Sequence, residues 1–155
     1  PGEDALRLEC IENVTRLRTA ADSAGMPVMV EPLVMDRKAG GYGVDGEADR
    51  IVALVRQATE LGADVIKADP TDDLSAYHRV VTTAGQTPVL VRGGGRVSDE
   101  EILERTRVVL EQGARGIVYG RNVIQHEDPL GVTRSLMAVV HDGLPAEEAL
   151  EQLRA

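Results

Sequence analysis

The stretch ADVIKAD, residues 63–69, is a short apolar run that follows Gly62 and carries a lysine in its interior. A continuous apolar run of this length between turn residues is typical of a buried parallel strand. Similar runs occur at residues 27–33, 87–92 and 116–120. Segments with helical spacing separate the four runs, and this alternation predicts parallel βαβ units.

The intervals between the runs have recognisable helix ends. Apolar spacing and capping residues predict helices that end at Gly25, Gly62 and Gly113, and others that begin at Asp72 or Asp73, Ser98, Pro129 and Pro145. Residues 36–46 are rich in glycine and are predicted to form a long loop. Cys10 falls on the apolar spacing of the first helix, which predicts a buried structural thiol.

Two architectures fit four βα units, an open doubly wound sheet and a barrel. A complete (β/α)8 barrel needs about 250 residues, so four units in 155 residues correspond to half of one. The chain begins with Pro1 and enters a helix almost at once, which suggests an interior cut. Composition alone does not choose between the two architectures.

Composition narrows the class of protein. The chain is 43% hydrophobic but has three Tyr, no Phe and no Trp, so its core must be aliphatic. The net charge of −9 and the lack of a basic stripe argue against a nucleic-acid surface. We see no signal peptide and no apolar run of membrane-spanning length, and the one cysteine has no internal partner. These features predict a cytoplasmic protein with no membrane contact.

Lys67 and Glu31 stand near the C-terminal ends of two neighbouring predicted strands. Strand alternation places each on the inward face, where a lysine is seldom buried without a partner. One interpretation is a structural ion pair of Lys67 with Glu31 or Asp69. The other is an amine that desolvation keeps uncharged and ready to attack a carbonyl, with Glu31 moving protons. Strand position leaves both open.

Two glycine-rich turns follow the third and fourth strands. The first is Arg92-Gly93-Gly94-Gly95, and the second is Gly120-Arg121-Asn122. Glycines let backbone N–H groups approach an anion, and a following helix N-terminus would add its dipole. In barrels, the loops after the last two strands often bind phosphate. Gly93, Gly94, Gly120 and Arg121 are therefore candidate phosphate-binding residues.

Three segments resemble one large group of class I aldolases: ADVIKADPTDD at 63–73, TPVLVRGGG at 87–95 and GARGIVYGRNVIQHEDP at 113–129. The group includes the archaeal-type fructose-bisphosphate, tagatose-bisphosphate and deoxyribose-phosphate aldolases. The resemblance implies a TIM (β/α)8 barrel, with residues 1–155 forming strands five to eight, the C-terminal half of one domain. It implies that Lys67 is the Schiff-base lysine and that Glu31 acts in acid–base chemistry. Gly116, Gly120, Arg121, Asn122 and Gln125 resemble the phosphate-binding end of the last strand.

The implied activity is the cleavage or formation of a C–C bond in a phosphorylated ketose or keto sugar acid. Arg92 replaces a residue that is small in the group, which suggests a second anionic group on the substrate. Leu33 stands near the position of a tyrosine that some members use as a proton donor. Two alternatives remain: a Schiff-base acyl- or aldol-transferase, or a non-catalytic barrel with a structural Lys67–Glu31 pair.

The expected partners are the missing N-terminal half-barrel and further copies of the chain in a homo-oligomer. No cofactor is expected for Schiff-base chemistry. His78, His126 and His141 show no spacing with Cys or Asp that suggests a metal site, so they are predicted to be structural or surface residues.

Overall fold

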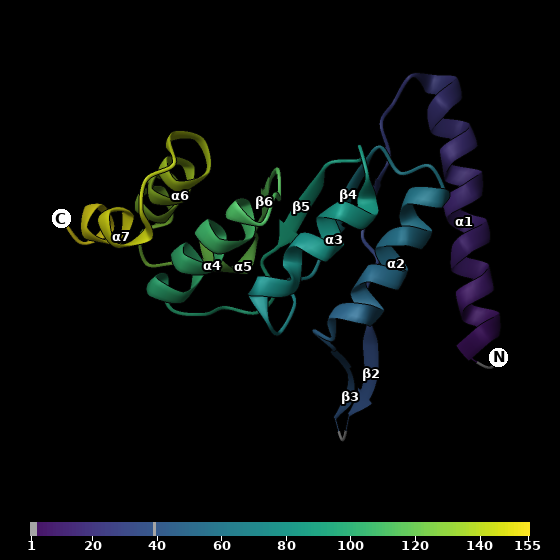
Figure 1. Cartoon of the computed structure of the whole chain (residues 1–155), viewed down its shortest axis with the longest axis horizontal. Helices are drawn as coiled ribbons and strands as arrows, with labels where there is room; N and C mark the ends of the chain where they lie inside the picture. Colours follow the sequence, from purple (N-terminus) through teal and green to yellow (C-terminus); the bar gives the residue numbers. More distant parts are fainter. Residues whose placement is uncertain (1–2, 39) are drawn as a thin grey trace.

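The computed structural model describes residues 3–38 and 40–155. Its main sheet has four parallel strands in the order β1 (Met29–Val30), β4 (Val65–Ala68), β5 (Val89–Arg92) and β6 (Gly116–Val118) (Figure 1). Each predicted run contains one of these strands. The first strand is shorter than predicted, because Pro27 and Pro32 flank it and proline has no N–H to donate to a neighbouring strand.

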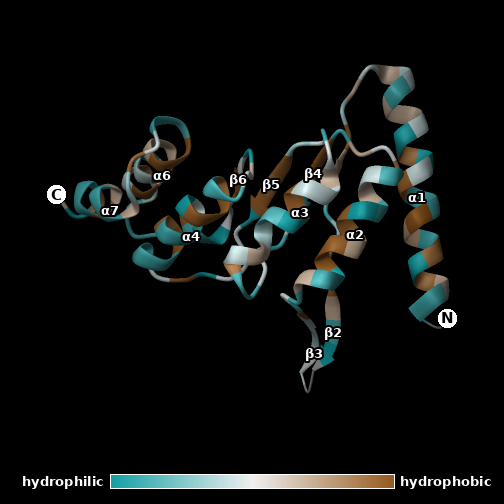
Figure 2. Ribbon diagram, viewed as in Figure 1, coloured by the Kyte–Doolittle hydropathy of each residue, from teal (hydrophilic) through white to brown (hydrophobic). Residues whose placement is uncertain are grey.

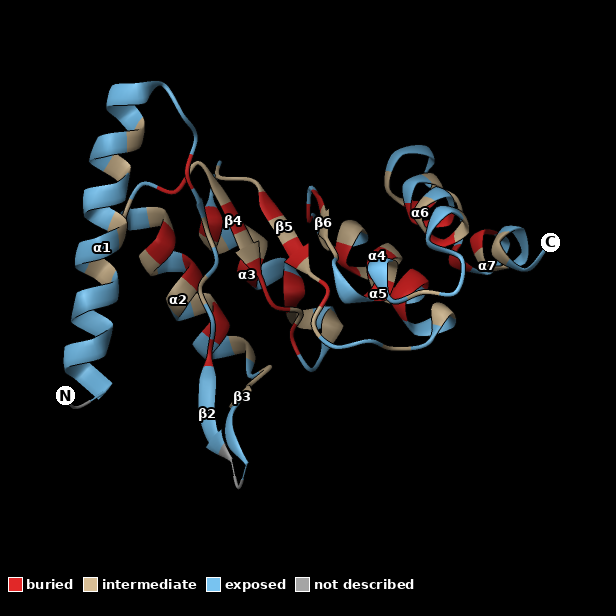
Figure 3. Cartoon of the chain, turned by 180° about the vertical axis from the view of Figure 1, so that it is seen from behind, coloured by how far each residue is buried: buried red, intermediate tan, exposed pale blue. Residues whose placement is uncertain are grey.

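Helices follow the strands as the alternation predicts. They are α1 (Glu3–Ala24), α2 (Ala48–Glu60), α3 (Tyr77–Ala84), α4 (Asp99–Glu111), α5 (Arg121–Ile124), α6 (Pro129–Met137) and α7 (Ala146–Arg154), with short turns η1 (Leu74–Ala76) and η2 (Ala138–Asp142). Seen from behind, β4 and β5 lie in front of α2 and α3, with no helix over the near face of these strands (Figure 3). Helices on one side only form a partial barrel, so the doubly wound alternative is wrong.

The register separates the two faces of the sheet. Ile66 and Ala68 pair with Val89 and Val91, and all four are at most 1% exposed beneath the helices. The opposite face carries Lys67 beside Leu90, and continuing the register places Glu31 beside Lys67 and Asp69 beside Arg92. The polar candidates therefore gather on the face without helices, at the C-terminal edge of the sheet.

The core consists of two aliphatic clusters. One lies between the sheet and helices α2 and α3, and the other joins α4, α6, η2 and α7. Hydrophobic residues are concentrated on β4, β5 and α2 (Figure 2). Tyr77, on α3, is the one aromatic residue among the largest fully buried side chains of the described residues. The predicted aliphatic core is thus confirmed.

The glycine-rich segment predicted as a loop is instead a β-hairpin. Strands β2 (Met35–Lys38) and β3 (Gly41–Val44) pair antiparallel, with Asp36 opposite Gly43. The Arg50 guanidinium holds the base of the hairpin through Asp36 and Asp45, at 2.9 and 2.7 Å. The prediction failed because the two strands are short and polar. The Gly-Gly pair is a hairpin signal, but no alternation of apolar and polar residues flanks it to support a hairpin.

Helix α1 has only a narrow contact with the rest of the chain. Ile11, Val14, Arg18 and Ala21 are half-buried, but no residue of α1 is fully buried. Cys10 is exposed, so the prediction of a buried thiol is wrong. It lies next to Ile11 in sequence, and about 100° of helical rotation turns it away from the packed side. In the described part of the chain, no helix is both long and apolar enough to cross a membrane.

Candidate functional site

Lys67 is the third residue of β4. Its Nζ lies 2.9 Å from Oε2 of Glu31, which directly follows β1. The lysine side chain is 20% exposed and the glutamate side chain 35% exposed. The contact predicted between these residues is confirmed. A partly buried amine beside a carboxylate can either remain a salt bridge or exchange a proton with it.

Arg92 extends this pair into a chain of four charges. Its Nε lies 3.0 Å from Oε1 of Glu31, and its Nη1 donates to Oδ1 of Asp69 at 2.6 Å. Asp69, an expected partner of Lys67, pairs instead with Arg92. We call Lys67, Glu31, Arg92 and Asp69 the charge chain. Two positive and two negative groups alternate along it, so its formal charge is zero.

Asp69 is the most buried member of the charge chain. Its side chain is 5% exposed, and Oδ2 is buried with no hydrogen-bond partner among the described residues. The hydroxyl of Tyr77 on α3 is likewise buried without a described partner. Burial is the main cause that raises the pKa of the Tyr77 phenol, and electrostatic interaction with Tyr119 and Asp69 acts in the same direction. Tyr77 therefore remains protonated and is a hydrogen-bond donor.

The glycine loop, residues 93–95, is held by side chains that follow β6. The Asn122 amide donates to the carbonyls of Gly93 and Gly95 at 3.2 and 3.0 Å, and its oxygen accepts from Val97 N at 3.0 Å. Arg121 Nη2 donates to the Gly94 carbonyl at 2.7 Å. These contacts turn the loop carbonyls toward residues 121 and 122. The Arg121 guanidinium thus organises the loop in addition to its predicted place beside a phosphate.

Gly93 and Gly94 are required for different reasons. A Cβ on Gly93 would lie 2.8 Å from the Tyr119 ring, so this position needs glycine for close packing. Gly94 has φ of +64°, which is left-handed, with open space around the position of a Cβ. The Tyr119 hydroxyl donates to Thr106, whose own hydroxyl donates to the Ile102 carbonyl at 2.6 Å. The wall behind Gly93 is therefore a fixed aromatic ring.

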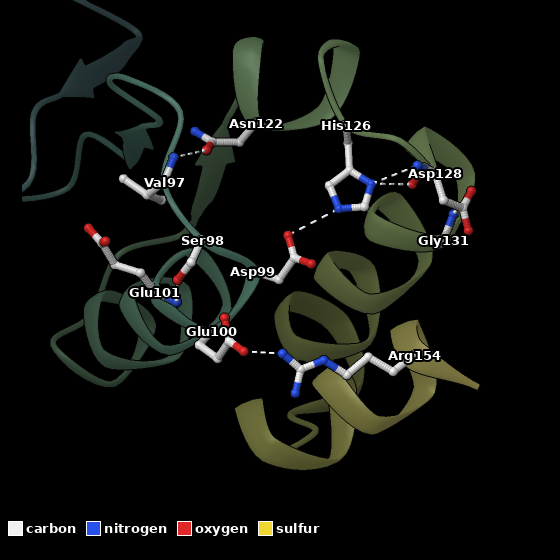
Figure 4. Close-up of polar contacts among 10 residues, drawn as sticks. All are labelled: Val97, Ser98, Asp99, Glu100, Glu101, Asn122, His126, Asp128, Gly131 and Arg154. Atoms are coloured by element: carbon white, nitrogen blue, oxygen red, sulfur yellow. Dashed lines mark hydrogen bonds and ion pairs between the residues drawn. The ribbon is translucent and has the colours of Figure 1, made fainter.

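The two helices after these loops differ in what their N-termini offer an anion. Helix α5, which begins after Gly120, has only four residues. Helix α4 is longer, but its first turn holds Asp99, Glu100 and Glu101, and the Ser98 hydroxyl accepts from Glu101 N. Asp99 binds His126 at 3.0 Å, and Glu100 pairs with Arg154 (Figure 4). The acidic residues of its first turn make the N-terminus of α4 unfavourable for an anion, whereas the first turn of α5 contains no acidic residue.

The histidines have structural or surface positions, as predicted. His78 and His141 are exposed, and His126 links Asp99 to the backbone of Asp128. Nδ1 of His126 lies 2.9 Å from both the backbone nitrogen and the carbonyl oxygen of Asp128, and Nε2 lies 3.0 Å from Oδ1 of Asp99 (Figure 4). Among the described residues, no group of three or more His, Cys, Asp or Glu could hold a metal ion.

Sequence reasoning placed Asn122 in a segment that resembles a phosphate-binding end but did not predict that it holds the glycine loop, and it gave Arg105 no role. Asn122 is 3% exposed, and an amide buried at the start of a helix signals a network of hydrogen bonds. Arg105, on α4, donates from Nη2 to the Gly93 carbonyl at 2.9 Å. It lies in a helix whose glutamates at 100, 101, 104 and 111 are exposed, so its sequence gives no comparable signal.

Comparison with known proteins adds the family context. A profile of the DeoC/LacD family aldolases matches residues 2–126. An uncharacterized aldolase of Saccharolobus solfataricus is 34% identical over 99% of this chain and 56% of its own length. A class 1 fructose-bisphosphate aldolase of Halobacterium salinarum is 37% identical over 79% of this chain and 47% of its own length. The chain therefore spans about half the length of these relatives.

A solved structure gives the corresponding likeness in three dimensions. It is an archaeal fructose-1,6-bisphosphate aldolase with its catalytic lysine covalently bound to the carbinolamine intermediate of the substrate. The two structures superpose with a TM-score of 0.77 at 32% sequence identity, over 86% of this chain and 52% of the other.

Proposed function

This chain belongs to the DeoC/LacD family of aldolases, and from that premise we propose that it forms the C-terminal half of a class I aldolase barrel. Strands β1, β4, β5 and β6 are then barrel strands five to eight, and residues 1–155 are one half of a single domain. The enzyme cleaves or forms a C–C bond in a phosphorylated ketose or keto sugar acid. Lys67 forms the Schiff base, and an N-terminal half-barrel closes the sheet. The assembled enzyme is cytoplasmic and homo-oligomeric.

One observation carries the proposal: the Lys67 amine lies 2.9 Å from the Glu31 carboxylate on the inner face of the sheet. Active sites of (β/α)8 barrels lie at the C-terminal ends of the strands, which is where these two residues meet. The chain contains only one other lysine, Lys38, at the end of the hairpin strand β2. Lys67 is thus the amine that the fold directs toward the barrel interior.

The pair can perform the first half of the reaction. Glu31 accepts a proton from the Lys67 ammonium, and the neutral amine adds to the substrate ketone to give a carbinolamine. Glu31 then returns its proton to the departing hydroxyl, which leaves as water. The product is an iminium on Lys67, and Glu31 is again a carboxylate.

The iminium is the electron sink for the second half. A carboxylate removes the proton from the substrate hydroxyl on the carbon at the far side of the C–C bond to be cleaved. The electron pair of that C–C bond then moves into the iminium. An aldehyde leaves and an enamine remains on Lys67. Protonation of the enamine carbon and addition of water then release the ketone and restore the amine. The lysine supplies the electron sink, so the scheme needs no further cofactor.

The substrate phosphate is placed against Gly93, Gly94, Gly120 and Arg121. Arg121 and Arg105 both contact the glycine loop, and neither forms an ion pair with a carboxylate in the described part of the chain. The charge chain, in contrast, has no net charge to attract a phosphate. Both observations support a phosphate at the loop and the ketone carbon at Lys67.

Borohydride reduction in the presence of dihydroxyacetone phosphate tests the proposal. Borohydride reduces an iminium to a stable secondary amine, so we expect a mass increase that peptide mapping assigns to Lys67. Lys67→Arg is the matched control, because a guanidinium keeps the positive charge beside Glu31 but cannot form the iminium. If the assembled barrel with intact Lys67 gains no label, the Lys67–Glu31 pair is structural and the aldolase proposal is wrong.

A further inference from the structure

The charge chain ends in a buried carboxylate that the proposed chemistry does not use. Asp69 follows the last residue of β4, and Arg92 is the last residue of β5. Their side chains meet at 2.6 Å across the sheet. Asp69 is too deeply buried to touch a substrate, since its side chain is 5% exposed. Its effect on the site must pass through Arg92.

Arg92 is committed to the protein on two sides. Its Nη1 donates to Asp69, and its Nε lies 3.0 Å from Glu31. A planar guanidinium bound to two carboxylates has a fixed orientation, and its charge is already compensated. The two carboxylates use two of its five N–H donors and compensate its charge, which weakens its attraction for a further anion. The geometry therefore favours a bridge between the two carboxylates over a receptor for a second anionic group.

Glu31 is the residue that benefits from this arrangement. It lies beyond the end of the two-residue strand β1, so backbone pairing does not continue through it. Its two oxygens are divided between Lys67 and Arg92, at 2.9 and 3.0 Å. Arg92 thus fixes one oxygen so that the other faces the amine, and Asp69 fixes Arg92.

We propose that Asp69 is a positioning residue that acts through Arg92 to hold the Glu31 carboxylate against the Lys67 amine. Arg92 serves as the bridge and not as a receptor for a substrate anion. This inference rests on the proposed function, because Glu31 must move protons for its position to affect a rate. Small displacements of a catalytic group lower rates without a comparable change in binding.

The test measures how fast Lys67 is trapped by borohydride at several concentrations of dihydroxyacetone phosphate. Asp69→Asn and Arg92→Lys are compared with the wild-type sequence in the assembled barrel. We expect each to lower the trapping rate at saturation by about 10- to 100-fold, and to change the half-saturating concentration by less than about twofold. The double variant should be no slower than the slower single variant, because both substitutions break the same connection, which runs from Asp69 through Arg92 to Glu31.

Asp64→Asn is the matched control. Asp64 also pairs with an arginine, Arg18, but it lies just before β4, at the opposite end from Lys67. It should leave the saturated trapping rate unchanged within about twofold. Arg92→Lys keeps a cation beside Glu31, but an ammonium on a flexible stem lacks the planar fork that fixes the two carboxylates, so the conclusion does not depend on Asp69→Asn folding well.

Three outcomes would overturn the inference. Asp69→Asn could trap as fast as Asp64→Asn, or the two site variants could be fully additive. Either variant could instead raise the half-saturating concentration at an unchanged saturated rate, which would make Arg92 a substrate receptor. Absence of label in the wild-type sequence is a separate result that refutes the proposed aldolase activity, and the positioning role with it.

Discussion

Asp64 and Asp69 flank the same strand, and each pairs with an arginine from another element. Asp64 precedes β4 and binds Arg18 of α1, whereas Asp69 follows β4 and binds Arg92 of β5. The first pair fastens α1, none of whose residues is fully buried. The second borders the proposed catalytic residues. One strand thus has a structural pair at its N-terminal end and a functional pair at its C-terminal end.

The Asp64 pair should make stability depend on pH. The Val28 N–H, which donates to Asp64 at 2.7 Å, and the Arg18 guanidinium lower the pKa of this carboxyl from its usual 3.8. A lowered pKa in the folded state adds stability at neutral pH, and this contribution is lost as pH falls from about 4 through the lowered value. Asp64→Asn should therefore melt below the wild-type sequence at pH 7, with a smaller difference near pH 2.5. An equal difference at both pH values would contradict this assignment.

Lys67→Ala should eliminate turnover while leaving the fold intact. Glu31 keeps its 3.0 Å contact with Arg92 in this variant, so we expect a loss of stability of no more than about 1 kcal/mol. Lys67→Arg should be equally inactive and retain more of the stability. Turnover by product analysis and thermal melting separate the two effects. Substantial activity in Lys67→Arg would rule out Schiff-base chemistry.

Substitution of Gly94 should affect phosphate binding before it affects chemistry. Its φ of +64° makes Gly94→Ala strained by about 1–2 kcal/mol, although space is open around the position. Gly94→Asn is the control, because asparagine tolerates left-handed backbone better than other residues. We expect Gly94→Val to raise the half-saturating concentration of dihydroxyacetone phosphate by at least about 10-fold, and Gly94→Asn to raise it less. Equal values for the wild type and Gly94→Val would argue against a phosphate at this loop.

Asn122→Ala should loosen the glycine loop. The change leaves Val97 N–H and the carbonyls of Gly93 and Gly95 without this partner, at a cost of about 1–3 kcal/mol in unfolding free energy. Asn122→Asp keeps the acceptor for Val97 but loses both donors, so it should also weaken phosphate binding. Asn13→Ala, on the exposed side of α1, is the control and should have little effect. Denaturant unfolding measures the loss of stability, and the trapping assay measures the weaker phosphate binding. If neither changed, Asn122 would have no role in the site.

Much of this architecture follows from the sequence, because apolar runs between glycines and prolines constrain parallel strands strongly. The inward placement of Lys67 and Glu31 also follows, since strand alternation allows only two faces. Arg92 shows where such reasoning ends. The sequence shows an arginine at the start of a glycine-rich turn, but only the sheet register brings Asp69 close enough to bind it. Cys10 shows the same limit. Helical spacing defines an apolar stripe on the helix, but it does not show how much of that stripe another element covers.

The separation of charge between the glycine loop and the charge chain has a consequence for how salt acts on the enzyme. Arg121 at the loop is exposed to counterions, whereas the charges around Lys67 compensate one another over short distances. Dissolved ions screen exposed charges over about 8–10 Å and affect close, partly buried pairs much less. Rising ionic strength should therefore weaken capture of the phosphorylated substrate and leave the rate of the bound complex nearly constant. Affinity would then follow the composition of the surrounding medium, while the chemical step would not.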